Sequence, residues 1–194
     1  EVKLTKLEEL LLLPTDTVMN YYDLSNDSIR EFPDLSSYTI TSLNLSYNQL
    51  DTLIVDYMPK DIVSLNLSHN EFEGLFRLSA YKKNMPWKEE QRLYKESTIR
   101  ELDLSYNRIQ DIFIRFPLRR IIVSYNDLID FYPNDDSLQY LDISHNYNLS
   151  NIVKVDFKKI DTIIRDSIAN NEPFERYVWP PPPPPPPEPN IMPD

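Results

Sequence analysis

The chain has 194 residues, of which 41% are hydrophobic, and this suffices for one domain of ordinary size with a core of its own. It contains no cysteine and a single glycine, which excludes disulfides, thiolate metal sites, a cysteine nucleophile and a glycine-rich phosphate loop. The net charge of −11 disfavours a nucleic-acid partner, because binding to phosphates depends on cationic side chains.

Residues 1–18 are predicted to form an N-terminal cap on the repeats that follow. Their apolar side chains recur at the spacing of an amphipathic segment: Val2, Leu4, Leu7, Leu10 and Leu11. Such a segment would cover the apolar end of a repeat array. No stretch of the chain reaches the roughly 18 consecutive apolar residues that a membrane-spanning helix needs.

Residues 19–151 contain six copies of one short motif, apolar-x-apolar-Ser-x-Asn-x-apolar. The clearest copies cover residues 43–50, 65–72 and 102–109, and weaker copies start at residues 22, 121 and 141. Each copy has an apolar residue three positions upstream: Met19, Ile40, Ile62, Ile99, Leu118 and Leu138. These upstream residues are spaced 21, 22, 37, 19 and 20 residues apart, which indicates a repeat structure with one insertion.

The motif resembles the leucine-rich repeat signature L-x-x-L-x-L-x-x-N-x-L over roughly residues 19–150. The short period is similar to that of the classes with roughly 20–22 residues per repeat, and it leaves the subclass open. The resemblance implies an α/β solenoid with a curved parallel β-sheet on its concave face and caps at both ends. Since coils this short leave little room for full helices, we expect extended or 3₁₀ segments on the convex face.

The asparagines of the motif form a predicted asparagine ladder: Asn48, Asn70, Asn107, Asn126 and Asn146. Each amide is expected to bond backbone groups of its own turn and of the next coil, because stacking buries those groups. Asp27 replaces the asparagine in the first copy, which suits a terminal repeat with fewer neighbours. Apolar residues five positions further along are predicted to close the core on the convex side: Leu53, Leu75, Ile112 and Phe131.

The long gap between the third and fourth repeats predicts an insertion over residues 76–98. It holds six basic and three acidic residues. Residues 86–96 are predicted to form a short helix, with Asn84 as its cap and Pro86 early in the first turn. An insertion of this length is either a binding excursion or a tolerated loop. Trp87 is its candidate binding residue.

The outward positions of the repeats define a candidate concave binding face. They include an unbroken column of serines: Ser25, Ser46, Ser68, Ser105, Ser124 and Ser144. Beside it run aromatic and acidic columns, from which we expect these side chains to contact a protein partner: Tyr47, His69, Asp103, Tyr106, Tyr125, Asp142 and His145. The alternative is that these residues are ordinary fillings of the repeat. The two histidines lie three strands apart, too far to share a metal, and no cofactor is predicted.

Residues 152–171 continue the apolar pattern without the asparagine and are predicted to form a C-terminal cap. Within them, residues 154–157 (Lys-Val-Asp-Phe) resemble the basic-Val-x-Phe docking motif for type-1 protein phosphatase. Alternatively, Val155 and Phe157 belong to the core of the cap.

Residues 172–194 form a proline-rich tail with a net charge of −3. Eight consecutive prolines from Pro180 to Pro187 predict a polyproline II rod about 25 Å long. The start of this tract resembles the aromatic-plus-proline ligand of EVH1 domains: Trp179, Pro180, Pro181, Pro182 and Pro183. Profilin and SH3-like modules also bind such rods. The alternative is a stiff spacer.

These features predict a non-catalytic scaffold for protein–protein interaction in the cytoplasm, whose concave face binds one protein and whose tail recruits a proline-recognition module. The alternatives are a structural component of a larger assembly such as a viral particle, and a phosphatase-regulatory subunit. An enzyme is not expected, because the serines, histidines and aspartates lie in repeat columns, without a nucleophile elbow or a second domain to form a cleft.

Overall fold

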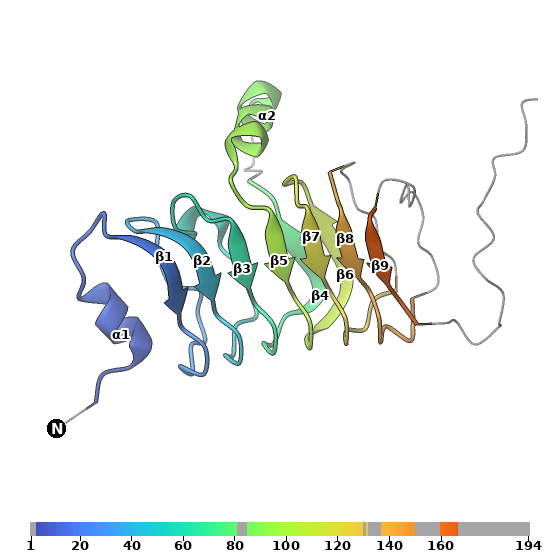
Figure 1. Cartoon of the computed structure of the whole chain (residues 1–194), viewed down its shortest axis with the longest axis horizontal. Coiled ribbons are helices and arrows are strands. Elements are labelled where there is room, and N and C mark those ends of the chain that lie inside the picture. Colours follow the sequence, from blue (N-terminus) through green and yellow to red (C-terminus); the bar gives the residue numbers. More distant parts are fainter. Residues whose placement is uncertain (1–2, 81–84, 130, 132–136, 150–159, 167–194) are drawn as a thin grey trace, which may run out of the picture.

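The computed structural model of the chain describes residues 3–80, 85–129, 131, 137–149 and 160–166. In these ranges the chain forms stacked coils whose main strands make a seven-stranded parallel sheet (Figure 1). The strands follow one another in space in the order β1 (Val18–Asp23), β2 (Thr39–Asn44), β3 (Ser64–Asn66), β5 (Glu101–Asp103), β7 (Arg120–Ile122), β8 (Tyr140–Asp142) and β9 (Thr162–Ile164). The predicted α/β repeat solenoid is confirmed.

A continuous apolar core runs behind the main sheet. The strand register places one row of side chains side by side: Leu43, Leu65, Leu102, Ile121 and Leu141. A second row two residues later is at most 2% exposed: Leu24, Leu45, Leu67, Leu104, Val123 and Ile143. A single short strand cannot bury its apolar face, so each coil depends on its neighbours for burial.

The sheet continues beyond the six predicted copies of the motif. Strand β9 pairs with β8 in parallel register, Leu141 opposite Ile163, and lies within the region predicted as the C-terminal cap. The motif did not reveal this coil because no asparagine follows the strand at the expected position.

The convex side is formed by extended and 3₁₀ segments, as predicted. Residues Val55–Tyr57 form a 3₁₀ helix, and β4 (Glu73–Leu78) pairs with β6 (Arg108–Ile114) in a two-stranded parallel sheet. Because Phe76 and Leu78 are buried in β4, the insertion begins after this strand and not at residue 76.

Leu75 was predicted to join the core, but the structure leaves 46% of its surface exposed. The register of β4 against β6 shifts between Gly74 and Leu75, and Gly74 adopts a φ of +65°, which favours glycine. The extra residue is Gln110 on β6, whereas β4 alternates without interruption, so Phe76 and Leu78 are buried and Leu75 faces outward. Of the other predicted convex residues, Ile112 and Phe131 are buried and Leu53 is partly buried.

The insertion carries helix α2 (Trp87–Glu96), which projects beyond the upper edge of the main sheet next to β5 (Figure 1). Its N-cap is Pro86, which corrects the predicted place of this proline within the first turn, and the predicted cap Asn84 lies outside the described residues. Tyr94 anchors the helix to the solenoid, because it is buried edge-to-face on Phe116 at 5.4 Å between ring centroids. Its hydroxyl donates to the buried Glu90 carboxylate.

Helix α1 (Lys6–Leu11) covers the N-terminal end of the solenoid, as expected for the predicted cap (Figure 1). A capping box between Thr5 and Glu8 starts the helix. The apolar contact is narrower than predicted, since Leu10 is fully buried whereas Leu4 and Leu11 are largely exposed. Val2 lies outside the described residues.

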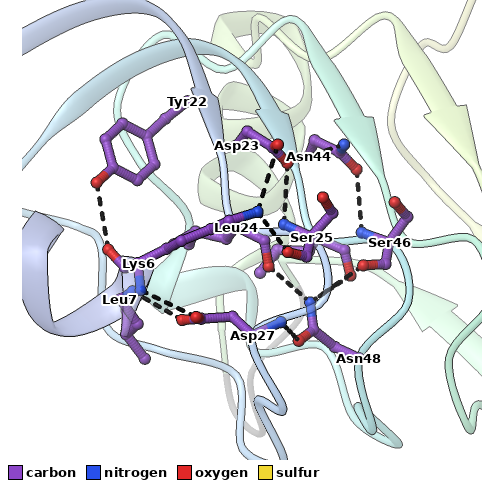
Figure 2. Close-up of polar contacts among 11 residues, drawn as sticks. Lys6, Leu7, Tyr22, Asp23, Leu24, Ser25, Asp27, Asn44, Ser46 and Asn48 are labelled. Carbon is purple, nitrogen blue, oxygen red and sulfur yellow. Dashed lines mark hydrogen bonds and ion pairs between the residues drawn. The ribbon is translucent and has the colours of Figure 1, made fainter. Parts of the chain in front are cut away.

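Asp27 joins this cap to the first coil (Figure 2). Its two carboxylate oxygens accept the backbone N–H groups of Lys6 and Leu7 at 2.9 and 2.8 Å. The Lys6 ammonium donates to the Ser25 carbonyl at 2.6 Å, and in the following coil the Asn48 amide donates to the equivalent Ser46 carbonyl. The cap helix presents N–H donors, so the position requires an acceptor-only carboxylate and the lysine supplies the missing donor.

Replacing Asp27 with alanine is expected to destabilise the protein by about 1–3 kcal/mol, because two partly buried N–H groups of the first helical turn lose their acceptor. Urea denaturation measures the change. Glu73→Ala is the control, since it removes a carboxylate from an exposed ion pair with Arg108 and should cost less than about 1 kcal/mol. Equal losses in the two variants would contradict the capping role of Asp27.

Candidate protein-binding surface

Five aromatic side chains form one continuous column of stacked rings, called here the aromatic stack: Tyr47, His69, Tyr106, Tyr125 and His145. Successive ring centroids lie 4.0, 4.1, 4.2 and 3.9 Å apart, and successive planes are inclined by only 9–11°. Offset or parallel aromatic pairs of this kind contribute roughly 0.5–1.5 kcal/mol each beyond the burial of their surface. The structure therefore brings all five predicted aromatic residues together.

The backbone of the turn after each strand sets the geometry of the aromatic stack. All five residues have φ between 52° and 57°, in the left-handed region that bulky side chains rarely adopt. Their N–H groups donate to the neighbouring coil, as Tyr47 does to the Ser68 carbonyl at 3.0 Å. In the coil of β8, the His145 N–H instead donates to the Asp166 carboxylate, just after β9. Repetition of one unusual conformation in every coil thus holds the rings parallel.

The aromatic stack covers the faces of its rings and leaves their edges open to solvent. Tyr47, Tyr106 and Tyr125 are 53%, 44% and 41% exposed. The Tyr106 hydroxyl beside Tyr125 raises the pKa of Tyr125 above its ordinary value, since it favours the neutral phenol. The surface therefore offers a strip of ring edges and protonated hydroxyls.

Tyr147 adds a sixth ring that the sequence analysis did not identify. Its ring meets His145 edge-to-face at 6.2 Å, and 84% of its surface is exposed. It lies one residue after Asn146, where the other repeats have no aromatic residue, so the repeat pattern could not reveal it.

The serine column does not face outward as predicted. The serines of the five complete motifs are only 5–7% exposed: Ser46, Ser68, Ser105, Ser124 and Ser144. In four of these five motifs, the acidic or amide residue two positions before the serine fixes the turn. Asp103 Oδ1, for example, accepts hydrogen bonds from the N–H and the hydroxyl of Ser105 at 2.9 and 2.7 Å. The left-handed turn that presents the rings also turns the serines inward.

Asp103 and Asp142, predicted to contact a partner, have a structural role in these turns. One oxygen of Asp142 accepts from the N–H and hydroxyl of Ser144 at 3.0 and 2.7 Å, as Asp103 does from Ser105. Both aspartates are partly buried, beside the aromatic stack. They contribute negative charge to the surface, but their residue type is already explained by the turn.

The column one position ahead of the buried leucines was missed by the sequence analysis. These residues lie side by side and, being two positions before the acidic column, share its face: Tyr21, Ser42, Ser64, Glu101, Arg120, Tyr140 and Thr162. Within the column Arg120 stacks on the Tyr140 ring, its guanidinium carbon 3.7 Å from the ring centroid. The alternation of the strand could have identified this column.

The asparagine ladder holds the turns that carry the aromatic stack. Each amide NH₂ donates to carbonyls of its own turn and to one carbonyl of the preceding coil, as Asn107 does to Leu104, Ser105 and Leu67 at 3.0, 3.3 and 3.1 Å. Its oxygen accepts the N–H of Phe72, again from the preceding coil. The partner coil is therefore the preceding one, which corrects the prediction of the next.

The structure does not bring Trp87 to the aromatic stack. Trp87 is 62% exposed at the start of α2, which leads into the first residues of β5, whereas the stack follows the ends of the strands (Figure 1). The phosphatase-like motif at residues 154–157 and the tail with Trp179 and its prolines lie outside the described residues.

Neither a metal cluster nor a membrane-spanning helix is found in the described part of the chain. No group of three or more potential metal ligands occurs among the residues with described positions. Neither α1 nor α2 has the length and apolar character that a membrane crossing requires.

The stacked coils and the asparagine ladder define a repeat solenoid with the aromatic stack exposed on its surface. Comparison with known families agrees: the model described as "Leucine Rich repeat" matches residues 37–55 and 95–112. The chain is a leucine-rich repeat protein. No curated protein matches the chain.

Proposed function

We propose that the protein is a non-catalytic scaffold in the cytoplasm that binds a protein partner through the aromatic stack. Leucine-rich repeats generally mediate protein–protein interaction, and this family assignment supports the scaffold role. The observation that carries the proposal is the five-ring stack, since tyrosines presented rigidly at a surface are the residues that dominate binding energy in protein interfaces.

The charge beside the aromatic stack supports a partner with a basic segment. Carboxylates of Glu101, Asp103 and Asp142 lie on the strands next to it, with Arg120 stacked on Tyr140 among them. Outside the insertion and the tail, the repeat body carries a net charge of −11, since the +3 of residues 76–98 and the −3 of the tail cancel. A negative field would accelerate association with a cationic partner, and high salt would weaken that association by screening the field.

Tyr106→Ala should weaken capture of the partner at least tenfold, because it removes the central ring and interrupts the stack between His69 and Tyr125. Tyr57→Ala is the matched control, since Tyr57 is a comparably exposed tyrosine on the convex 3₁₀ helix and should leave capture unchanged. Affinity purification with each variant, followed by titration of the partner recovered, measures the effect. Equal retention by both variants would mean that the stack only stabilises the fold.

The tail is proposed as a second binding element that recruits a proline-recognition module. Its support is the sequence alone, in which Trp179 precedes eight prolines and Glu175 and Glu188 flank them. Such a rod exposes carbonyl acceptors without N–H donors and loses little entropy on binding.

A peptide of residues 172–194 should bind an EVH1, profilin or SH3 module with a dissociation constant of tens of micromolar or tighter, as measured by calorimetry. Trp179→Ala within the peptide should weaken binding to an EVH1 module, because the aromatic side chain anchors that ligand class. Failure of all three modules to bind would favour the alternative, in which the tail is a spacer or lattice contact in a larger assembly.

A further inference from the structure

Two arginines share one aromatic ring on the convex side of the solenoid. Arg77 on β4 lies opposite Phe113 on β6, and Arg115 is the first residue after β6, its N–H donating to the Leu78 carbonyl of β4. Their guanidinium carbons lie 5.5 and 5.3 Å from the Phe113 ring centroid. The neighbours Phe76 and Ile112 are buried, so alternation directs these three side chains outward. Together with the exposed Leu75 they are called here the arginine patch.

Among the described residues, the arginines of the patch differ from two other arginines that form ion pairs. Arg108 pairs with Glu73, and Arg92 pairs with both Glu89 and Glu96. Within the described residues, no carboxylate lies within ion-pair distance of Arg77 or Arg115, and both are exposed. Two like charges beside one ring repel each other, and an acceptor that bridges them would relieve this repulsion.

The chemistry of the proline tail matches that of the arginine patch. Arginine offers five N–H donors and no acceptor, whereas a run of prolines offers carbonyl acceptors and no donor. Proline rings pack on aromatic rings, as in other polyproline grooves, and Phe113 and Leu75 supply the apolar surface. The tail carries four carboxylates against one arginine, so its net charge of −3 complements the two cations.

We propose that the arginine patch is a docking surface for the proline tail of the same molecule, residues 172–194. The last described residue, Asp166, is separated from Pro180 by 13 residues, which span up to about 45 Å when extended. That reach is several times the spacing of about 5 Å between neighbouring coils. The acidic strands beside the aromatic stack repel the flanking Glu175 and Glu188, so charge directs the tail to the convex side.

A docked tail is inaccessible to other proteins. A proline-recognition module can bind only tails that have left the patch, so its apparent affinity is reduced by the docked fraction. This consequence rests on the proposed recruiting function, whereas docking itself does not.

The test uses the full chain with Trp87→Phe, which leaves Trp179 as its single tryptophan. When Arg77→Gln and Arg115→Gln are added to the Trp87→Phe chain, acrylamide should quench Trp179 fluorescence at least twofold more strongly than in the Trp87→Phe chain alone. Arg108→Gln is the matched control, because it removes the same charge from the same two-stranded sheet and should leave quenching unchanged. Circular dichroism verifies that the fold is kept.

Equal quenching in all variants would overturn the proposal, and so would quenching that changes on dilution, which indicates docking onto a second copy. Titration with a proline-recognition module separates docking from recruitment. The Arg77→Gln, Arg115→Gln chain should bind the module at least twofold more tightly than the wild-type chain, with the isolated peptide 172–194 as reference. If the isolated peptide binds no module while the quenching difference persists, the recruiting function fails and docking stands.

Discussion

Replacing Asn126 with aspartate is expected to destabilise the protein by about 3–5 kcal/mol, although the two side chains have the same shape. The buried Asn126 amide donates to the carbonyls of Leu104, Val123 and Ser124 at 2.9, 3.1 and 3.2 Å. A carboxylate would keep the bond that its oxygen accepts from the Ile109 N–H but would face three carbonyl oxygens without a donor. Repulsion between the buried carboxylate and the three carbonyl oxygens, together with the loss of the bonds that the amide donates, accounts for the destabilisation.

The matched control is Asn66→Asp, the same chemical change in the same kind of coil. Asn66 uses its oxygen to accept the Ser68 N–H at 2.9 Å, and the chain itself has aspartate at the equivalent positions 103 and 142. We expect a change within about 0.5 kcal/mol, as at most surface positions. Urea denaturation of the two variants gives both values. A similar loss at both positions would show that added negative charge, and not the donor role of the ladder, limits stability.

The fold could be predicted from the sequence because burial and hydrogen bonding recur with one period. Leu43, Leu65 and Leu102 occupy the same place in successive copies, and the register aligns them side by side. A repeat that cannot bury its apolar side alone has few alternatives to stacking on its neighbours. The asparagines reinforce the pattern, since each buried amide satisfies carbonyls that stacking removes from water.

The candidate binding surface could be predicted only in part, because its form depends on backbone dihedrals that no periodicity encodes. The left-handed conformation of Tyr106 places its ring in the aromatic stack and turns Ser105 inward, although alternation alone would place Ser105 outward and Tyr106 inward. The Arg77 and Phe113 contact arises from pairing between convex strands of different coils. Asp27 shows the converse, since its departure from asparagine was visible in the sequence while its partners on α1 were not.

Leu104→Ala is expected to cost about 3–5 kcal/mol, because truncation leaves a cavity between coils that cannot collapse independently. Leu104 is fully buried, and its N–H donates to the Ile122 carbonyl at 2.7 Å in the next coil, so the backbone around it is held on both sides. Thermal and urea denaturation measure the loss.

Leu75→Ala provides the matched control and tests the orientation of β4. The position of Leu75, five residues after Asn70, assigns it to the core and predicts a loss similar to that of Leu104→Ala, whereas its exposure of 46% predicts a loss below about 1 kcal/mol. A large loss at Leu75 would contradict the orientation of β4 in the structure. Phe76 and Leu78 would then face solvent and Arg77 would face the core, so the same measurement also tests the geometry of the arginine patch.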